Sequence, residues 1–254
     1  MSLHTEISSW LKDYIKKNNL ETFVVGISGG IDSAVTSTLC AMTKEDTILL
    51  TLPIHQNPDE TSRGKKHIKW LEEQYSNVQA LHIDLTDCYE TFKNTIPEKF
   101  QNDLALANTR ARIRMSALYA IAGSRNGIVV GTGNKIEDFG IGFFTKYGDG
   151  GVDISPIADL MKSEVYDLAE KIGVIDEILQ AKPTDGLWND GRTDEDQIGV
   201  SYDELEWAMS YNGKDIITTH QKNILEIYNN HRKKNMHKMM NIPIFKTDNS
   251  NEDN

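Results

Sequence analysis

The sequence predicts an α/β fold, with a Rossmann-like, doubly wound, mostly parallel sheet, helices on both of its faces and a helical C-terminal part. Short apolar runs alternate with stretches of helical periodicity in the first half of the chain, as expected for strands joined by crossover helices. After Pro156 the strand-like runs stop and only helical periodicity continues. A chain of 254 residues, 39% of them hydrophobic, can bury one large core, so residues 1–246 are expected to form a single domain.

The first element is predicted to be a helix over residues 3–17, because Leu3, Ile7, Leu11 and Ile15 recur at helical spacing. The alternation that follows predicts, in order, strand 23–28, helix 31–42, strand 47–52, helix 59–75, strand 78–83, a long helical region over 98–124 and strand 127–131. In the C-terminal part, the periodicity predicts helices over 161–172, 175–180, 202–211 and 215–241.

Two segments are expected to lie outside the regular helices and strands. Residues 184–196 are rich in Asp, Gly, Asn and Thr and are expected to be a mobile loop that orders over substrate. Residues 247–254 are expected to be a disordered tail.

The composition argues against several classes of protein. A net charge of −11 opposes non-specific binding to nucleic acid, which depends on neutralising phosphates with Lys and Arg. The sequence contains no apolar run of about 18 residues and does not begin like a secretory signal, so we expect a cytoplasmic protein without a membrane span. Cys40 and Cys88 form neither a metal pattern nor a disulfide framework and are expected to be small core residues.

The most informative motif follows the first predicted strand, where the chain reads Ser28-Gly29-Gly30-Ile31-Asp32-Ser33. The glycines let backbone N–H groups approach an anion, the serines add hydroxyl donors, and the start of the next helix contributes a partial positive charge. Asp32 stands where the common G-x-x-x-x-G-K-[ST] loop carries lysine, and a carboxylate beside phosphate needs a cation. The loop therefore predicts a site for a magnesium-bound nucleotide.

This loop resembles the S-G-G-x-D-S loop of the N-type ATP pyrophosphatases, an adenine nucleotide alpha hydrolase-like family that holds the pyrophosphate of ATP while the α-phosphate is attacked. Other segments are similar to those of the NAD synthetases within that family. They are Asn108-Thr109-Arg110-Ala111-Arg112-Ile113-Arg114-Met115, Gly131-Thr132-Gly133-Asn134-Lys135-Ile136-Glu137 and Thr145-Lys146-Tyr147-Gly148-Asp149-Gly150-Gly151-Val152-Asp153, followed by Pro156, Lys162, Pro183-Thr184, Asp194-Glu195, Tyr202 and His237-Lys238. The resemblance spans about residues 23–243.

The resemblance implies a set of ATP contacts, namely Ser28, Gly29, Gly30, Ile31, Asp32, Ser33, Thr132, Lys162 and Thr184. It also implies that Asp32 and Glu137 hold Mg²⁺, which prefers a few carboxylates together with phosphate and water oxygens. The loop after Glu137 is one residue longer than in some family members, so Asp138 is an alternative ligand. Lys162 would neutralise charge on the phosphates in the transition state, whereas a surface lysine at a helix start is the simpler alternative. For Thr132 the alternative is a strand cap.

A second set of residues matches positions that hold nicotinic acid adenine dinucleotide (deamido-NAD), namely Arg112, Lys146, Asp153, His237 and Lys238. The alternative for Arg112 is a solvated basic face, because Arg110 and Arg114 lie on the same predicted helix. The alternative for His237 is an ordinary helix end. Asp153 is also expected to orient ammonium or accept its proton, which would place it with Asp32 and Lys162 among the catalytic residues.

The implied function is ATP-dependent amidation of deamido-NAD to NAD through an adenylated intermediate, with release of AMP and pyrophosphate. Free ammonia is the expected nitrogen donor, since hydrolysis of glutamine would need an added amidotransferase domain; supply by a separate glutaminase stays open. The resemblance further implies a homodimer. The alternatives are another adenylating amidotransferase and a non-catalytic nucleotide sensor, and Asp32, Glu137 and Lys162 argue against the sensor because binding adenosine alone requires no carboxylates for a metal.

Overall fold

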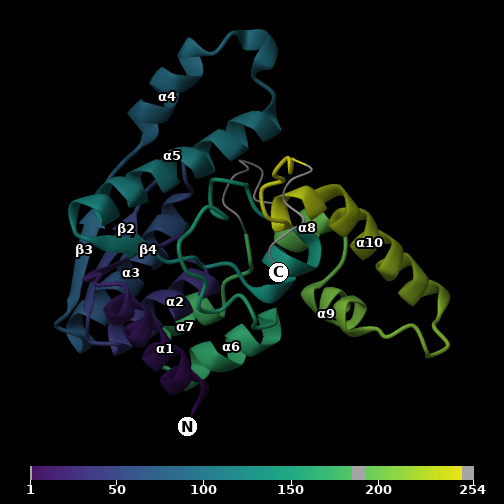
Figure 1. The fold of residues 1–254 in the computed structure, drawn as a ribbon, viewed down its shortest axis with the longest axis horizontal. Coiled ribbons are helices and arrows are strands. Elements are labelled where there is room, and N and C mark those ends of the chain that lie inside the picture. Colours follow the sequence, from purple (N-terminus) through teal and green to yellow (C-terminus); the bar gives the residue numbers. More distant parts are fainter. Residues whose placement is uncertain (1, 185–192, 248–254) are drawn as a thin grey trace.

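A parallel four-stranded sheet lies at the centre of the protein (Figure 1). The structure is a computed structural model that describes residues 2–184 and 193–247. The strands are β1 (Thr22–Gly26), β2 (Asp46–Thr51), β3 (Val78–His82) and β4 (Gly127–Val129), in the spatial order β3-β2-β1-β4. β2 and β4 flank β1 on opposite sides, so the strand order reverses at β1, the place where ligands bind in open α/β sheets. The predicted fold class is confirmed.

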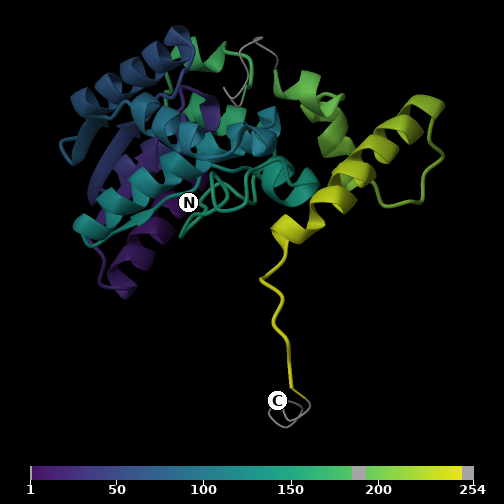
Figure 2. The same ribbon diagram turned by 90° about the horizontal axis from the view of Figure 1, so that it is seen from above.

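Helices cover both faces of this sheet and build a further lobe at its side (Figures 1 and 2). The described helices are α1 (Leu3–Lys17), α2 (Ile31–Met42), α3 (Pro58–Gln74), α4 (Thr86–Thr95), α5 (Asp103–Ser124), α6 (Lys162–Lys171), α7 (Asp176–Leu179), α8 (Asp194–Ile198), α9 (Tyr202–Ser210) and α10 (Thr219–Met239). A 3₁₀ turn at Glu98–Phe100 and a π-helical turn, η2, at Ile136–Ile141 complete the list. None of the helices in the described ranges is long and apolar enough to cross a membrane.

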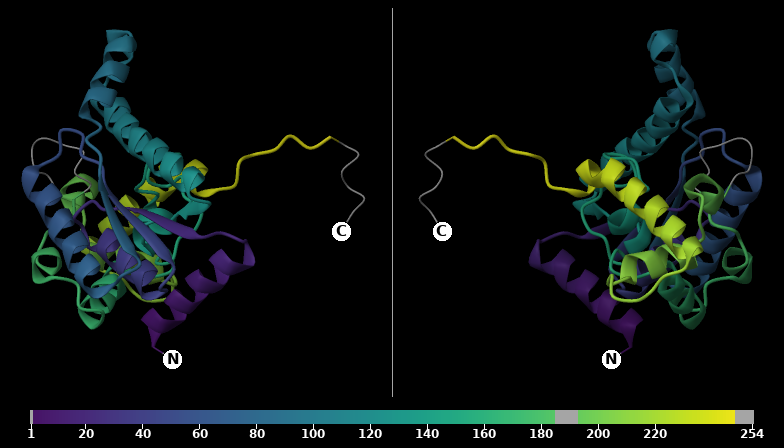
Figure 3. Two further views of the ribbon diagram at one scale, coloured as in Figure 1. Left: turned by 90° about the vertical axis from the view of Figure 1, so that its left-hand side faces the viewer. Right: turned by 90° about the vertical axis from the view of Figure 1, so that its right-hand side faces the viewer.

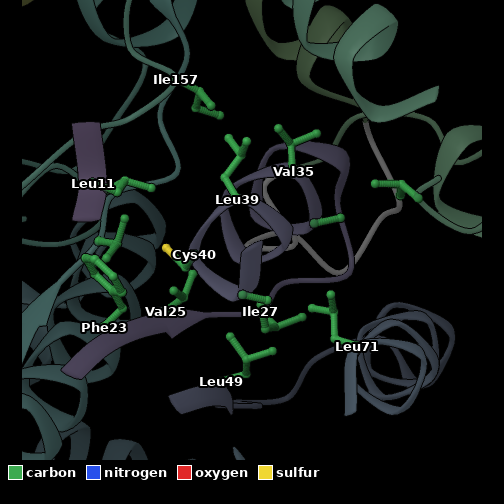
Figure 4. Close-up of a cluster of buried hydrophobic side chains, with 14 of the residues drawn as sticks. Leu11, Phe23, Val25, Ile27, Val35, Leu39, Cys40, Leu49, Leu71 and Ile157 are labelled. Carbon is green, nitrogen blue, oxygen red and sulfur yellow. The ribbon is translucent and has the colours of Figure 1, made fainter. Parts of the chain in front are cut away.

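β1, β2 and β4 are buried on both faces, which explains their continuous apolar runs, whereas the edge strand β3 is partly exposed. On one face, Phe23 and Val25 of β1 and Leu49 of β2 pack with Leu39 and Cys40 of α2, as Figure 4 shows. On the opposite face, alternate strand residues pack against α5, in a cluster that includes Val24, Ile48, Leu50, Met115 and Leu118. The lobe formed by η2, α8, α9 and α10 has a separate core that includes Ile136, Ile141, Leu205 and Tyr228.

The predicted element boundaries hold to within a few residues, except in two places. The helical region predicted over 98–124 is interrupted: α5 starts only at Asp103, where the Asn102 side chain accepts a hydrogen bond from the N–H of Ala105. α4 was not among the predicted helices; it is only ten residues long, and Tyr89 is its one buried residue. Cys88 lies on this helix and is exposed, so the core prediction is wrong for Cys88, whereas Cys40 is buried as expected.

The two segments predicted to be loose are only partly described. The loop predicted over 184–196 ends in α8, where Thr193 and Asp196 form a reciprocal capping box, so its last residues are helical. Residues 185–192 and 248–254 lie outside the described residues. After α10 the chain runs away from the body in an extended arm, seen in Figures 2 and 3.

A buried histidine in the core predicts acid lability. His67 of α3 is fully buried; its Nε2 lies 3.0 Å from the hydroxyl of Ser37 on α2, and burial lowers the pKa of His67 to about 4. Between about pH 6.5 and 4, the unfolded chain binds a proton at His67 that the native state does not. The contribution of this histidine to the free energy of unfolding is therefore fully present above pH 6.5 and is lost as the pH falls. We expect a loss of about 3 kcal/mol over this range.

Urea unfolding at pH 7 and pH 4.5 measures this effect. The His67→Gln variant should be less stable at pH 7 and should lose distinctly less stability on acidification, because it lacks the proton linkage. Parallel losses in the two proteins would contradict the role of His67.

Candidate active site

The glycine loop lies directly beyond the carboxyl end of β1, at the switch point of the sheet. Gly29 has φ +89°, and a Cβ atom at this position would overlap the carbonyl oxygen of Glu60 on α3. Both facts require glycine, because side chains disfavour this backbone conformation and α3 leaves no room for one. The backbone of the loop at Gly29 is therefore packed directly against the backbone of α3.

Hydrogen bonds within the loop organise its donors. The Ser33 hydroxyl accepts from the backbone N–H of Ser28 at 3.3 Å and donates to the carbonyl of Gly30 at 2.9 Å. The N–H of Gly30 donates to the Ser28 hydroxyl at 3.1 Å. Since α2 begins at Ile31, its partial positive charge lies at the same turn. Hydroxyls, amides and a helix start thus converge as an anion site requires.

The geometry at Gly29 predicts a strong effect of one methyl group. Gly29→Ala introduces both a strained backbone conformation and a collision with Glu60, so the loop must shift away from α3. We expect ATP affinity to fall by at least about tenfold, with a loss of roughly 1–3 kcal/mol in stability. Calorimetric titration with a non-hydrolysable ATP analogue measures this. Gly123→Ala, on the exposed end of α5 with open space around it, is the matched control and should bind normally.

A lysine clamped between two carboxylates lies beside the loop. Nζ of Lys162 is 2.6 Å from Oδ2 of Asp32 and 2.9 Å from Oε1 of Glu137. The three residues come from the starts of α2 and α6 and from η2. Lys162 is 3% exposed, so the alternative of a surface lysine is wrong. The predicted Asp32, Glu137 and Lys162 form a single charged cluster.

Two further residues complete this cluster. Asn134 is fully buried; its amide nitrogen donates to Oδ1 of Asp32 at 3.1 Å, and its amide oxygen accepts from the N–H of Glu137 at 3.0 Å. The hydroxyl of Tyr202 donates to Oε1 of Glu137 at 2.7 Å. Neither residue was predicted to have a role, although both lie in segments that carry the resemblance. The signal available in the sequence was the position of Asn134, three residues before the expected ligand Glu137.

The electrostatics of the cluster follow from burial and the central ammonium. Burial would lower the pKa of Lys162, but the charges of Asp32 and Glu137 outweigh it and hold that pKa well above its usual range. Burial would raise the pKa of Glu137, yet Lys162, Tyr202 and Asn134 keep it below its usual range. Burial raises the pKa of Asp32, and Lys162 offsets this only in part. Lys162 thus stays positively charged, and its single charge can balance only one of the two carboxylates that contact it.

The donor set fits a hard divalent cation. Two half-buried carboxylates face one ammonium, so a negative charge is left for a cation to neutralise. No group of three or more His, Cys, Asp or Glu side chains suited to a metal gathers in the described parts of the chain. Mg²⁺ needs fewer, since it is commonly held by one or two carboxylates together with substrate phosphates and water. The residues that would hold it are Asp32 and Glu137.

The structure also bears on the alternative ligand. The carboxylate of Asp138 lies against Gly133, where a Cβ atom would overlap it, and no ion pair joins Asp138 to Lys162 in the described part of the chain. Burial, with the charges of Glu137 and Asp149, raises the pKa of Asp138 to about 8. Glu137 lies in the π-helical turn η2, and both Glu137 and Asp32 accept hydrogen bonds from Lys162.

The residues predicted to hold the second substrate gather around the loop that follows η2. Nε of Arg112 donates to the carbonyl of Lys146 at 3.2 Å, and Nζ of Lys146 donates to the carbonyl of His237 at 3.1 Å. Nζ of Lys238 donates to the carbonyl of Phe144 at 2.6 Å. This loop therefore joins α5 to the end of α10, and it brings four of the five predicted residues together.

The other predicted contacts have different surroundings. Both oxygens of Asp153 accept hydrogen bonds, from the N–H of Val129 at 2.8 Å and from the hydroxyl of Tyr119 at 2.9 Å, so this carboxylate braces β4 against α5. Its predicted role with ammonia remains a prediction. Thr132 and Thr184 are half-buried, and their ATP contacts also remain predictions.

The three arginines of α5 do not form one solvated basic face. The guanidinium of Arg110 lies over the ring of Tyr89, 5.6 Å from its centroid. Nε of Arg114 donates to the carbonyl of Leu52 at 2.9 Å, which ties α5 to the end of β2. Of the three, Arg112 is the one that reaches the loop of the second site.

The parallel sheet, the glycine loop at its switch point and the buried acid–lysine cluster define a nucleotide-binding α/β protein of the ATP pyrophosphatase type. The family described as NAD synthase matches residues 3–248. The chain belongs to the NAD synthase family and is a ligase that forms an amide bond.

Individual relatives agree with this assignment. The chain is 37% identical to the NH(3)-dependent NAD(+) synthetase of Finegoldia magna, over 84% of this chain and 87% of that protein. Among solved structures, NMN synthetase from Francisella tularensis superposes with a TM-score of 0.86 at 34% identity and covers 96% of this chain and 98% of its own. The NH3-dependent NAD synthetase of Campylobacter jejuni gives a TM-score of 0.77 at 25% identity and covers 96% and 98%.

Proposed function

We propose that this protein amidates deamido-NAD to NAD with ATP and free ammonia and releases AMP and pyrophosphate. The observation that carries the proposal is the clamp of Lys162 between Asp32 and Glu137, directly beside a phosphate loop. Binding of a nucleotide alone needs no such cluster, whereas reaction at the α-phosphate needs charge neutralised there. Relatives named as NH(3)-dependent NAD(+) synthetases support ammonia as the donor.

In this mechanism the protein positions two anions and stabilises charge. The carboxylate of the pyridine ring attacks the α-phosphorus of ATP to give an acyl adenylate and pyrophosphate, and ammonia then displaces AMP. Amides and hydroxyls of the Ser28–Ser33 loop would hold the phosphates, and Lys162 would face the charge that develops on them. Bound Mg²⁺ would neutralise phosphate oxygens and polarise the phosphorus.

The four residues around the 142–153 loop would hold the second substrate. Arg112, Lys146 and Lys238 supply positive charge for its phosphates, and His237 lies beside them at the end of α10. Because Asp153 is engaged by Val129 and Tyr119, its part would be to position the loop as well as any ammonium close to it.

A second candidate is amidation of the mononucleotide, giving NMN instead of NAD. It is favoured by the close structural likeness to the NMN synthetase of Francisella tularensis, whose TM-score and identity both exceed those of the Campylobacter jejuni NAD synthetase. Both reactions use the same chemistry at the pyridine carboxylate. They differ in whether the protein recognises the adenylate half of the acceptor.

One assay distinguishes these functions. The protein is incubated with ATP, Mg²⁺ and ammonium, and either deamido-NAD or nicotinic acid mononucleotide, and products are separated by chromatography. The first proposal expects NAD, AMP and pyrophosphate in equal amounts, with the higher kcat/KM for the dinucleotide. A higher kcat/KM for the mononucleotide favours the second candidate. Formation of ADP, or no turnover with either acceptor, would remove both.

The proposal includes a cytoplasmic homodimer that uses no nucleic acid. Exposed apolar side chains on α5, including Leu104 and Tyr119, give a surface on which two copies could pack. Both cysteines are free thiols, as expected in a reducing compartment. The net charge of −11 disfavours a polyanionic partner.

A further inference from the structure

The phosphate loop, residues 28–33, has no cationic side chain of its own. It carries Asp32 where common phosphate loops carry lysine, and the nearby Lys162 already bonds two carboxylates. The loop amides bind phosphate as partial charges only. The leaving pyrophosphate bears several negative charges, and charge-assisted hydrogen bonds from a guanidinium are the usual way to hold such a group.

Arg63 of α3 lies where this charge is needed. Its Nε donates to the carbonyl of Gly29 at 3.4 Å, which places the side chain against the phosphate loop. The contact is a consequence of close packing, because α3 approaches the loop so tightly that Gly29 must be glycine. The terminal nitrogens of Arg63 donate to no described residue. The side chain is half-buried, so it keeps access to a ligand.

A cavity opens beside Arg63. It has a volume of about 380 Å³ and lies between α3 and α7, lined in part by Asp59, Arg63, Lys66 and Glu177. Lys66 and Glu177 neutralise each other in an ion pair of 3.1 Å. Asp59 makes no ion pair with Arg63 among the described residues, so the guanidinium is not neutralised within the cavity. This space is large enough for a diphosphate group.

We infer that Arg63, which contacts the phosphate loop and lines the cavity between α3 and α7, binds the β- and γ-phosphates of ATP beside that loop and then the pyrophosphate that leaves; this rests on the proposed function. When a carboxylate oxygen attacks the α-phosphorus, the bond from that phosphorus to the α,β-bridging oxygen breaks. The bridging oxygen leaves with the pyrophosphate and carries the bonding electron pair. Arg63 neutralises this new charge and makes departure easier, so it is a catalytic residue outside the motifs of the family resemblance.

Direct binding tests this without turnover. Calorimetry with magnesium pyrophosphate, and separately with AMP, compares the wild type with Arg63→Ala, Arg63→Gln and Arg63→Lys. We expect pyrophosphate affinity to fall about 10- to 100-fold in the alanine and glutamine variants. It should fall less in the lysine variant, which keeps the positive charge but cannot make the paired hydrogen bonds of a guanidinium. Affinity for AMP, which has no β- or γ-phosphate, should stay within about twofold of the wild type.

Matched controls separate ligand binding from support of the loop. Lys69→Ala removes a positive charge from the same helix at a side chain that is 79% exposed, and it should bind pyrophosphate as the wild type does. Arg63→Gln can still donate to Gly29, so wild-type pyrophosphate affinity in this variant would show a purely structural role and overturn the inference. An equal loss of AMP and pyrophosphate affinity would overturn it as well.

The failure of this inference differs from failure of the proposed function. If the wild type produces neither NAD nor NMN but binds pyrophosphate through Arg63, the acceptor assignment fails and the role of Arg63 stands. If the wild type is active and Arg63→Ala keeps both its KM for ATP and its inhibition by pyrophosphate, only the role of Arg63 fails.

Discussion

Asparagine in place of Asp32 is expected to lower kcat/KM on the order of a thousandfold and to leave the protein folded. The substitution keeps the size of the side chain but removes one of the two carboxylates that face Lys162. The proposed metal loses a ligand, and the charge pattern beside the α-phosphate changes by one unit at a buried position. The cost arises in the transition state, so it should appear mainly in kcat, with a smaller effect on the KM for the pyridine substrate.

Pyrophosphate release is the appropriate measurement, since it reports the first half-reaction for any acceptor. Asp13→Asn is a matched control, because Asp13 lies exposed on α1 and belongs to no part of the site. Its rate should equal that of the wild type, and both variants should melt within a few degrees of the wild type. Undiminished pyrophosphate release by the Asp32 variant would refute the central role of the acid–lysine cluster.

The phosphate loop is the part of the site that residues adjacent in the sequence specify. The six residues from Ser28 to Ser33 are enough to indicate a phosphate loop, because strand, glycine turn and helix start follow one another along the chain. The sheet could likewise be predicted from its alternation of apolar strands and helices. The order of its strands became apparent only in the structure, since it depends on which crossovers pass on which side of β1.

The residues that were missed, and the contacts that join the predicted ones, depend on segments that are distant in the sequence. Tyr202 meets Glu137 across 65 positions of the sequence, and Lys162 meets Asp32 across 130. The local sequence around Lys162 was equally consistent with a phosphate contact and with an exposed lysine at a helix start. The packing of α6 against α2 buries this side chain. Arg63 is an extreme case, because α3 reads as an ordinary charged helix until its contact with Gly29 is seen.

Removing Lys162 is expected to affect stability as much as catalysis. In Lys162→Met, the stem of the side chain still packs, but two half-buried carboxylates are left facing each other without a counter-charge. Breaking a buried ion pair on one side commonly costs about 3–5 kcal/mol, because the charge that remains is uncompensated. For a protein of this size, that corresponds to a fall in Tm of roughly 10 °C. Activity should fall at the same time on the order of a hundredfold or more.

A double variant and a magnesium titration test the cause of this instability. Adding Glu137→Gln to Lys162→Met removes one of the opposed charges and should recover part of the lost stability, a non-additive effect typical of residues in contact. Millimolar Mg²⁺ should raise the Tm of Lys162→Met more than that of the wild type, since the cation then replaces the ammonium between Asp32 and Glu137. Additive losses together with equal responses to Mg²⁺ would show that the two carboxylates do not share a cation site.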